Sequence, residues 1–352
     1  MEHERTHGGD WAGFALAHGD LPLDFSANIS PLGVPRGVQE ALREAAGQAD
    51  RYPDPPCREL RGALSDHEDV PAEWVLCGSG AADLIFRAVL ALRPRRALVT
   101  APTFTEYEAA LETVGCAVER YALWPEEDFR LRPDILEKIT PETDLLFLCE
   151  PNNPTGVTTS RPLLLCILER CRETGTRLVL DECFGDFLDE PELHTLKGAL
   201  ADFPNLLILK AFTKLYGMAG VRLGYALCAD TERLERMRRA GQPWAVSSLA
   251  QAAGVAALKE TDYVRQVRAL IAAERPRLAE QMERLGLRVV PGEANYLLFR
   301  SETPLDASLG QRGILLRCCG NYAGLDGTWY RAAVRTRAEN QRLIAALEEV
   351  LA

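Results

Sequence analysis

Residues 206–227 read LLILKAFTKLYGMAGVRLGYAL, and this stretch decides how the rest of the chain is interpreted. Its two ends, LLIL and GYAL, are short apolar runs typical of buried strands. Between them Lys214 stands in an apolar, glycine-rich loop, with Arg222 eight residues further on. A lysine on a loop is ordinarily a solvated surface charge. Desolvation and a nearby cation, however, both lower the pKa of a lysine, as an imine-forming amine requires.

The segment from about residue 72 to 230 repeats this alternation of short apolar runs with helical stretches. Gly, Pro, Asn or Asp stands at the junctions, which favours an α/β layer built on a largely parallel sheet. Apolar residues at helical spacing predict a helix over Ala81–Leu92. The predicted strands are Trp74–Cys77, Ala97–Thr100, Leu145–Cys149, Leu178–Leu180, Leu206–Leu209 and Gly224–Leu227.

Beyond about residue 240 the pattern changes to a long charged helix over roughly Asp262–Leu285. The strands predicted after it are Leu287–Val290, Tyr296–Phe299 and Trp329–Val334, and a final helix starts at about Ala338. The sequence therefore predicts a large domain over residues 46–240 and a smaller α+β domain over residues 241–352. Residues 1–45 are expected to join the smaller domain.

Composition and charge exclude several classes of protein. The 352 residues carry a net charge of −11, which argues against nucleic acid and anionic membranes as partners because both attract clustered Lys and Arg. The N-terminus MEHERTHGGDWAG is charged where a signal peptide is apolar, and no apolar run is long enough to cross a bilayer, so a cytoplasmic location is expected. None of the ten cysteines forms a CxxC motif, and the neighbours Cys318 and Cys319 are poorly placed to chelate one ion. We therefore expect reduced thiols and no metal.

Three polar motifs follow apolar runs, at the strand ends where open α/β sheets bind ligands. CGSGAAD at 77–83 leads into the predicted helix, where backbone N–H groups and the helix dipole favour a phosphate, although a plain turn has the same composition. EPNNPTG at 150–156 forces a rigid turn, which is either an ordinary Asn-Pro turn or a fixed place for the amide of Asn153. Asp181 follows LVL at a buried strand end, where an acid needs a cationic partner unless it caps a helix.

Taken together, these motifs resemble those of class I and II aminotransferases, and the resemblance covers essentially the whole chain. It implies a pyridoxal 5′-phosphate (PLP) enzyme of fold type I, the aspartate-aminotransferase-like fold. Lys214 would then form the Schiff base to the cofactor, and Asp181 would keep the pyridine nitrogen protonated, which makes the ring an electron sink. Asn153 would bind the ring 3-hydroxyl, and Phe104 would stack on the ring face.

The same resemblance also implies which residues bind the cofactor phosphate and which residue reaches a partner subunit. The phosphate would be held by Thr213, Arg222 and the backbone N–H groups of Gly80 and Ala81. Tyr52, in the run RYPD, matches a tyrosine that reaches into the neighbouring subunit's site, which implies a homodimer.

Two positions depart from the transaminase pattern. Phe184 stands three residues after Asp181, where the pattern usually has a tyrosine that donates to the ring 3-hydroxyl. Ala211 stands three residues before Lys214, where Ser or Thr is common, so one phosphate contact is missing.

A narrower resemblance comes from the two ends of the chain. HGGD at 7–10, LDFSANISPLG at 23–33, RCCGNYAGL at 317–325 and YRAAVR at 330–335 are similar to the threonine-phosphate decarboxylases, a family close to the histidinol-phosphate aminotransferases. This implies decarboxylation of L-threonine O-3-phosphate to (R)-1-amino-2-propanol O-2-phosphate for the nucleotide loop of cobalamin. The residues expected to bind the substrate are His7, Asn28, Asn153, Arg317 and Arg331.

Alternatives stay open for these residues and for the reaction. Arg335 forms with Arg317 and Arg331 a set of arginines that could clamp two anions, but for Arg335 a surface position in a strand is the expected alternative. The alternative for His7 is a frayed terminus. The reaction is otherwise transamination of a phosphorylated amino acid such as histidinol phosphate, or decarboxylation of O-phosphoserine. A third class is a regulator with this fold and no catalysis.

Overall fold

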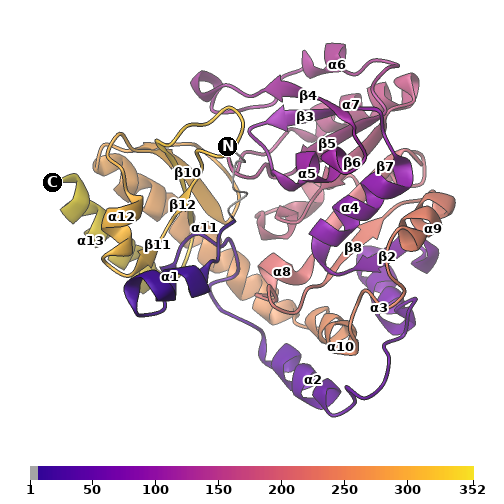
Figure 1. Ribbon diagram of the computed structural model, residues 1–352, viewed down its shortest axis with the longest axis horizontal. Coiled ribbons are helices and arrows are strands. Elements are labelled where there is room, and N and C mark those ends of the chain that lie inside the picture. Colours follow the sequence, from indigo (N-terminus) through magenta and orange to yellow (C-terminus); the bar gives the residue numbers. More distant parts are fainter. Residues whose placement is uncertain (1–6) are drawn as a thin grey trace.

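A seven-stranded sheet in the order β2-β8-β7-β6-β5-β3-β4 forms the centre of the larger part of the molecule (Figure 1). The computed structural model describes residues 7–352. Neighbouring strands are parallel except at β8, which is antiparallel to both β2 and β7, so the predicted largely parallel sheet is confirmed. The strands are β2 (Val75–Gly78), β3 (Arg96–Ala101), β4 (Ala117–Ala122), β5 (Leu145–Cys149), β6 (Arg177–Asp181), β7 (Leu206–Ala211) and β8 (Gly224–Leu227).

Both faces of this sheet are buried, which explains why its strands read as continuous apolar runs. Successive side chains of a strand point to opposite faces, so Leu145 and Phe147 of β5 enter one core and Leu146 and Leu148 enter another. The first core also contains residues of α4 (Gly80–Leu92), α5 (Glu106–Glu112) and α9 (Thr231–Arg239). The second contains residues of α7 (Arg161–Thr174). The sheet is therefore a middle layer between helices.

A four-stranded antiparallel sheet in the order β12-β13-β10-β9 lies beside the larger one (Figure 1). Its strands are β9 (Arg288–Val289), β10 (Tyr296–Arg300), β12 (Arg317–Cys318) and β13 (Trp329–Ala333), and its neighbouring helices are α11 (Thr261–Arg284), α12 (Asp306–Gly310) and α13 (Arg337–Leu351). The N-terminal strand β1 (Leu23–Asp24) pairs in parallel with β11 (Ile314–Leu315). Residues far apart in sequence thus meet in this part of the chain, although the predicted domain boundaries themselves remain a prediction.

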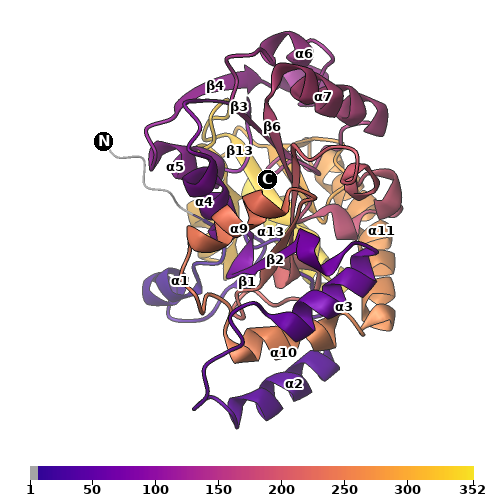
Figure 2. The ribbon, with the colours of Figure 1, turned by 90° about the vertical axis from the view of Figure 1, so that its right-hand side faces the viewer.

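The remaining helices are α1 (Trp11–His18), α2 (Arg36–Ala46), α3 (Arg58–Glu68), α6 (Ile135–Lys138), α8 (Phe212–Leu215) and α10 (Ser248–Ala257). Figures 1 and 2 both show α2 alongside α10 at one end of the molecule, and α6 lies at the opposite end. Short 3₁₀ turns span Ala72–Trp74, Pro125–Glu127, Gly185–Phe187, Pro191–Leu193 and Lys197–Ala199. None of the helices in residues 7–352 combines the length and hydropathy that crossing a bilayer requires.

The predicted elements are all present, with errors at their ends, and among the strands β1, β4, β11 and β12 were not predicted. The predictions are wrong by one residue at Trp74, Leu287, Val290 and Val334, which lie just outside the strands, and at Leu285, which lies just outside a helix. Strand β4 was not predicted, because only Tyr121 of its six residues is buried and the segment AVERYA lacks an apolar pattern.

Candidate active site

A cavity of about 160 Å³ opens at the carboxyl ends of β5, β6 and β7, beside the first turn of α4. Strand ends and the start of a helix therefore converge on one site, as open α/β sheets favour. Seven of the residues predicted to hold the cofactor line it. The full lining is Ala81, Ala82, Phe104, Cys149, Asn153, Asp181, Cys183, Phe184, Ala211, Thr213, Lys214 and Arg222.

Lys214 lies in the single turn of α8, directly after β7. Its Nζ is 5.4 Å from the centre of the Phe184 ring, so an aromatic face without a hydroxyl lies beside the amine. Burial of the amine, together with the positive charges of Arg331 and Arg222, lowers the pKa of Lys214 to about 8. A much larger fraction of this amine is uncharged at neutral pH than of a solvated lysine, which suits a nucleophile.

Asp181 ends β6 with its carboxylate buried. Oδ2 accepts a hydrogen bond from Tyr107 Oη at 2.8 Å, and Oδ1 accepts one from the backbone N–H of Cys183 at 3.0 Å. Burial raises the pKa of Asp181, while these donors and the Lys214 charge oppose the rise. Phe184 occupies the N-cap position of the next 3₁₀ turn and no side chain caps that turn, so the Asp181 carboxylate is not a helix cap. A protonated ring nitrogen is the kind of partner that such an acid requires.

The turn before α4 has the shape that a phosphate requires. Gly80 begins the helix with a φ of +83°, and a Cβ there would come within 2.6 Å of Nη2 of Arg222. The same Nη2 donates to the backbone oxygen of Ser79 at 3.4 Å. Since the first N–H groups of a helix lack partners within the helix, the turn presents donors next to a guanidinium. The donor set therefore fits the cofactor phosphate.

Arg331 connects the cofactor cavity to the small sheet. One guanidinium nitrogen donates to Asn153 Oδ1, and the other donates to the backbone oxygen of Ser26 at 2.9 Å. The guanidinium also lies over the ring of Tyr296, 5.4 Å from its centre. Because Arg331 is buried, its planar fork is held in one orientation at the edge of the site, where it suits an anion.

The other predicted substrate residues occupy separate positions around this edge. Arg317 is buried, donates to Asn321 Oδ1 at 2.8 Å and lies over the ring of Tyr322. Asn28 is 1% exposed, and neither side-chain amide atom has a hydrogen-bond partner among the described residues. A buried amide without partners is costly, which points to a polar ligand. His7 is the first of the described residues, and its Nε2 lies 3.0 Å from Glu106 Oε1.

The structure also shows the surroundings of Arg335 and Tyr52. Arg335 is not a surface arginine, because it is partly buried and donates to Glu339 Oε1 at 2.7 Å and to the backbone oxygen of Asp24 at 3.0 Å. Tyr52 does not line the cavity of its own chain. It is 81% exposed and stacks on Trp244, with ring centres 4.8 Å apart.

Sequence reasoning missed two residues that support this site. Tyr107 bonds to Asp181, and its only signal in the sequence is its position three residues after Phe104. Asp83 lies in the predicted phosphate motif and accepts a hydrogen bond from the backbone N–H of Ser79. Asp83 and Arg87 are four residues apart, a spacing that is common for ion pairs on exposed helix surfaces. The sequence therefore did not indicate that Arg87 is buried.

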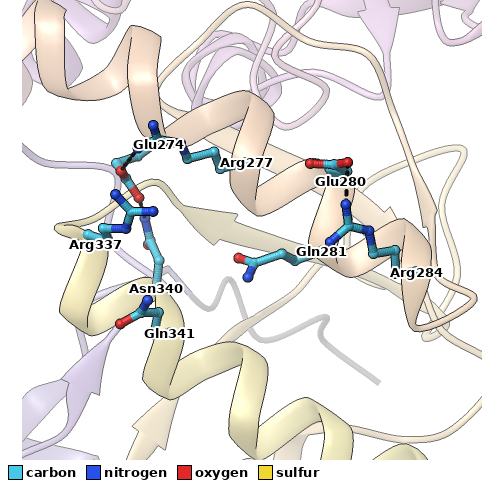
Figure 3. Close-up of a pocket in the computed structure, with 8 residues that line it drawn as sticks. All are labelled: Glu274, Arg277, Glu280, Gln281, Arg284, Arg337, Asn340 and Gln341. Atoms are coloured by element: carbon cyan, nitrogen blue, oxygen red, sulfur yellow. Dashed lines mark hydrogen bonds and ion pairs between the residues drawn. The ribbon is translucent and has the colours of Figure 1, made fainter.

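A second hollow lies away from these strand ends, between α11 and α13 (Figure 3). This groove of about 180 Å³ is lined by Glu274, Arg277, Glu280, Gln281, Arg284, Arg337, Asn340 and Gln341. Its two carboxylates each pair with an arginine of the same helix, Glu274 with Arg277 and Glu280 with Arg284. Such pairs are typical of a solvated helix face, so we assign no function to the groove.

Comparison with known proteins agrees with the geometry. The chain is 42% identical to the threonine-phosphate decarboxylase of Salmonella typhimurium, over 98% of this chain and 96% of that protein. It is 37% identical to a histidinol-phosphate aminotransferase of Symbiobacterium thermophilum, over 94% of this chain and 90% of that protein. The crystal structure of L-threonine-O-3-phosphate decarboxylase from Porphyromonas gingivalis superposes with a TM-score of 0.82 at 26% identity, covering 93% of this chain and 98% of that one.

The family model for aminotransferase class I and II matches residues 22–347, which is nearly the whole chain. The predicted fold type, the PLP dependence and the enzymatic nature of the chain are thereby confirmed. The relatives at 37% and 42% identity and the strand-end cavity with Lys214 and Asp181 agree with this match. The chain belongs to the class I and II aminotransferase family.

Proposed function

We propose that the chain is a PLP-dependent lyase that decarboxylates L-threonine O-3-phosphate to (R)-1-amino-2-propanol O-2-phosphate. The observation that carries this proposal is the 42% identity to a threonine-phosphate decarboxylase over 98% of the chain. A substrate with two anionic groups suits two buried arginines, Arg331, which donates to Asn153 of the cavity, and Arg317, which is paired with Arg331 across β12 and β13. The net charge of −11 is no obstacle, because a small anion meets this local field.

The substrate-binding set supports recognition of a phosphate and a carboxylate. Arg331 and Asn153 form one hydrogen-bonded unit that can bind an anionic oxygen, and Arg317 offers a second guanidinium. The Asn28 amide, buried without partners, would complete the site when a polar substrate group reaches it. His7, held by Glu106, would close over the substrate from the N-terminal segment.

The cofactor-binding set supports the chemistry. When bound, PLP supplies an electron sink for the pair of electrons that remains at Cα after CO₂ departs. Asp181 would hold the proton on the ring nitrogen, and Lys214 would hold the cofactor covalently. The turn at Gly80 and Ala81, with Thr213 and Arg222, would hold the cofactor phosphate. With a pKa of about 8, Lys214 Nζ can carry a proton to or from the substrate at physiological pH.

The assembly and the biological setting are further parts of this proposal. Tyr52 and Trp244 present a stacked aromatic pair to solvent, at 81% and 46% exposure, which supports a homodimer in which Tyr52 reaches the partner's cofactor. A cytoplasmic location is supported by the ten cysteines, all of which are free thiols. The product is the amino-alcohol phosphate that the nucleotide loop of cobalamin requires, so we place the reaction in that synthesis.

Measurement of CO₂ release from O-phosphothreonine tests the proposal directly. The purified protein with PLP should release CO₂ from this compound without any oxo-acid acceptor. One additional methyl in an apolar pocket discriminates by about 10–200-fold, so O-phosphoserine should react more slowly but measurably. Free threonine leaves the buried donors unpaired and should be rejected far more strongly. Equal rates for threonine and its phosphate would contradict the anion site.

Transamination is the second candidate, and it is favoured by the 37% identity to a histidinol-phosphate aminotransferase. Both reactions use the same cofactor residues, and they differ in which bond at Cα is broken. Incubation with histidinol phosphate and 2-oxoglutarate separates them. Glutamate formation at a rate above that of CO₂ release from O-phosphothreonine would replace the lyase proposal with an aminotransferase.

A further inference from the structure

A single tyrosine connects the segment that carries Phe104 to the Asp181 carboxylate. Tyr107 lies in the first turn of α5 and is fully buried. Its hydroxyl donates to Oδ2 of Asp181 at 2.8 Å, while Oδ1 of the same carboxylate accepts from the backbone N–H of Cys183 at 3.0 Å. The side chain of Cys183 also hydrogen-bonds this carboxylate, so Tyr107 is one of two side-chain donors to Asp181, and its hydroxyl is the one bonded to Oδ2.

The Tyr107 ring is held on two sides. It stacks on Phe147 of β5 with ring centres 4.8 Å apart and an angle of 6° between the planes. It also meets Phe104, which lines the cofactor cavity, edge to face at 5.6 Å. Because packing fixes the ring, the direction of the hydroxyl toward Asp181 is fixed as well.

The hydrogen bond from Tyr107 also affects the ionisation of Asp181. Burial raises the pKa of Asp181, and the Tyr107 hydrogen bond is one of the interactions that oppose the rise. Burial and the Asp181 charge raise the pKa of Tyr107 well above its usual value, so the phenol stays protonated and remains a donor. A neutral Asp181 would lose its attraction for a protonated ring nitrogen.

We propose that Tyr107 is a positioning residue that keeps Asp181 ionised and aimed at the ring nitrogen of the cofactor. This inference rests on the proposed role of Asp181 as the partner of that nitrogen. It adds that the carboxylate cannot perform the role alone in so buried a place. Tyr107 does not touch the substrate, so its effect should be visible in cofactor binding before any reaction occurs.

Binding of two cofactors to the apoprotein tests this proposal. One is PLP, and the other is the analogue in which a carbon atom replaces the ring nitrogen, which has no charge for Asp181 to stabilise. Wild-type protein should bind PLP more tightly than the analogue. In Tyr107→Phe the dissociation constant for PLP should rise by about tenfold, equivalent to about 1.4 kcal/mol, while that for the analogue should stay within about twofold. The dissociation constants follow from absorbance titrations without substrate.

A matched control is available on the edge strand β4. Tyr121 Oη also donates to a carboxylate, that of Asp134, but neither residue lines the cofactor cavity. Tyr121→Phe should change neither dissociation constant. Thermal unfolding of both apoprotein variants near the wild-type temperature would show that the folds are intact.

The possible outcomes separate this inference from the function on which it rests. Equal weakening of both cofactors in Tyr107→Phe would mean that the tyrosine only supports the fold, and it would overturn the inference. An unchanged preference for PLP in Tyr107→Phe would overturn it as well. If wild-type protein shows no preference for PLP, and Asp181→Asn binds both cofactors like wild type, the proposed role of Asp181 fails first.

Discussion

The carboxylate of Asp83 accepts a hydrogen bond from the backbone N–H of Ser79 through Oδ2, at 2.9 Å. Its Oδ1 accepts a second one from Nε of Arg87 at 2.8 Å. Arg87 is itself only 4% exposed, and its guanidinium lies so close to Gly241 that a Cβ there would come within 2.2 Å of Cζ. The turn expected to hold the cofactor phosphate is thus fixed by a partly buried ion pair on its own helix.

Replacing Arg87 should therefore weaken both the fold and the cofactor site. Arg87→Met removes the more buried partner of this partly buried pair, which we expect to cost about 1–3 kcal/mol of unfolding free energy. Because Asp83 loses its second anchor, we expect the dissociation constant for PLP to rise by about tenfold. Urea unfolding of the apoprotein and absorbance titration measure the two effects. Arg238→Met is the control, since its pair with Glu235 is exposed and should contribute less than about 1 kcal/mol. A lowered stability with unchanged PLP affinity would make the pair purely structural.

Gly80 should tolerate no side chain. A Cβ at this position meets Arg222, and the φ of +83° is unfavourable for any other residue. Gly80→Ala should lower the unfolding free energy by about 1–2 kcal/mol and raise the dissociation constant for PLP by at least about tenfold, because Arg222 must move away from the turn. In the control Gly62→Ala, the new methyl meets nothing within 4 Å inside α3, and stability should rise slightly. PLP binding by Gly80→Ala at wild-type affinity would exclude this turn from the phosphate site.

These residues also show what the sequence could predict. LLFLC at Leu145–Cys149 was readable as a strand because both faces of the sheet are buried, and its polar successor Asn153 was readable as a strand-end ligand. Strand β4 could not be predicted from the sequence, because an edge strand with one buried residue has no apolar run. The pairings of Arg331 with Asn153 and of Tyr107 with Asp181 span 178 and 74 residues and depend on tertiary packing, which local patterns do not record.

The pKa of Lys214 predicts how the apoprotein takes up its cofactor as the pH changes. The uncharged amine is the nucleophile, so the rate of covalent attachment should rise with pH up to about 8 and then level off, far below the usual lysine value of about 10.4. Because the Arg331 charge is one cause of the lowered pKa, Arg331→Gln should shift the midpoint to higher pH. Stopped-flow absorbance over a pH series measures it. Arg335→Gln is the control, since Arg335 pairs with Glu339, and an identical shift in both variants would contradict the assignment to Arg331.

The last prediction concerns the buried pair behind the Lys214 loop. Glu68 Oε1 accepts from Nζ of Lys210 at 3.0 Å and also from the hydroxyl of Tyr225. Burial opposes ionisation of Glu68, but the Lys210 charge and these hydrogen bonds outweigh it and lower the pKa of Glu68 to about 2. A carboxyl whose pKa is lower in the folded state adds stability above its unfolded pKa of about 4.3 and loses it as the pH falls toward 2.

Glu68→Gln should therefore lower the unfolding free energy of the apoprotein by about 3 kcal/mol at pH 7, and this difference should shrink between about pH 4.5 and 2. Urea unfolding at several pH values measures both. Glu235 provides the contrast, because its pKa is also lowered to about 2 by Arg238 and Arg239, yet its side chain is 36% exposed and solvent screens its pairs. Glu235→Gln should cost well under 1 kcal/mol at every pH. If Glu68→Gln and Glu235→Gln lost the same stability with the same pH dependence, burial of the Glu68–Lys210 pair would not be the cause of the contribution of Glu68 to stability.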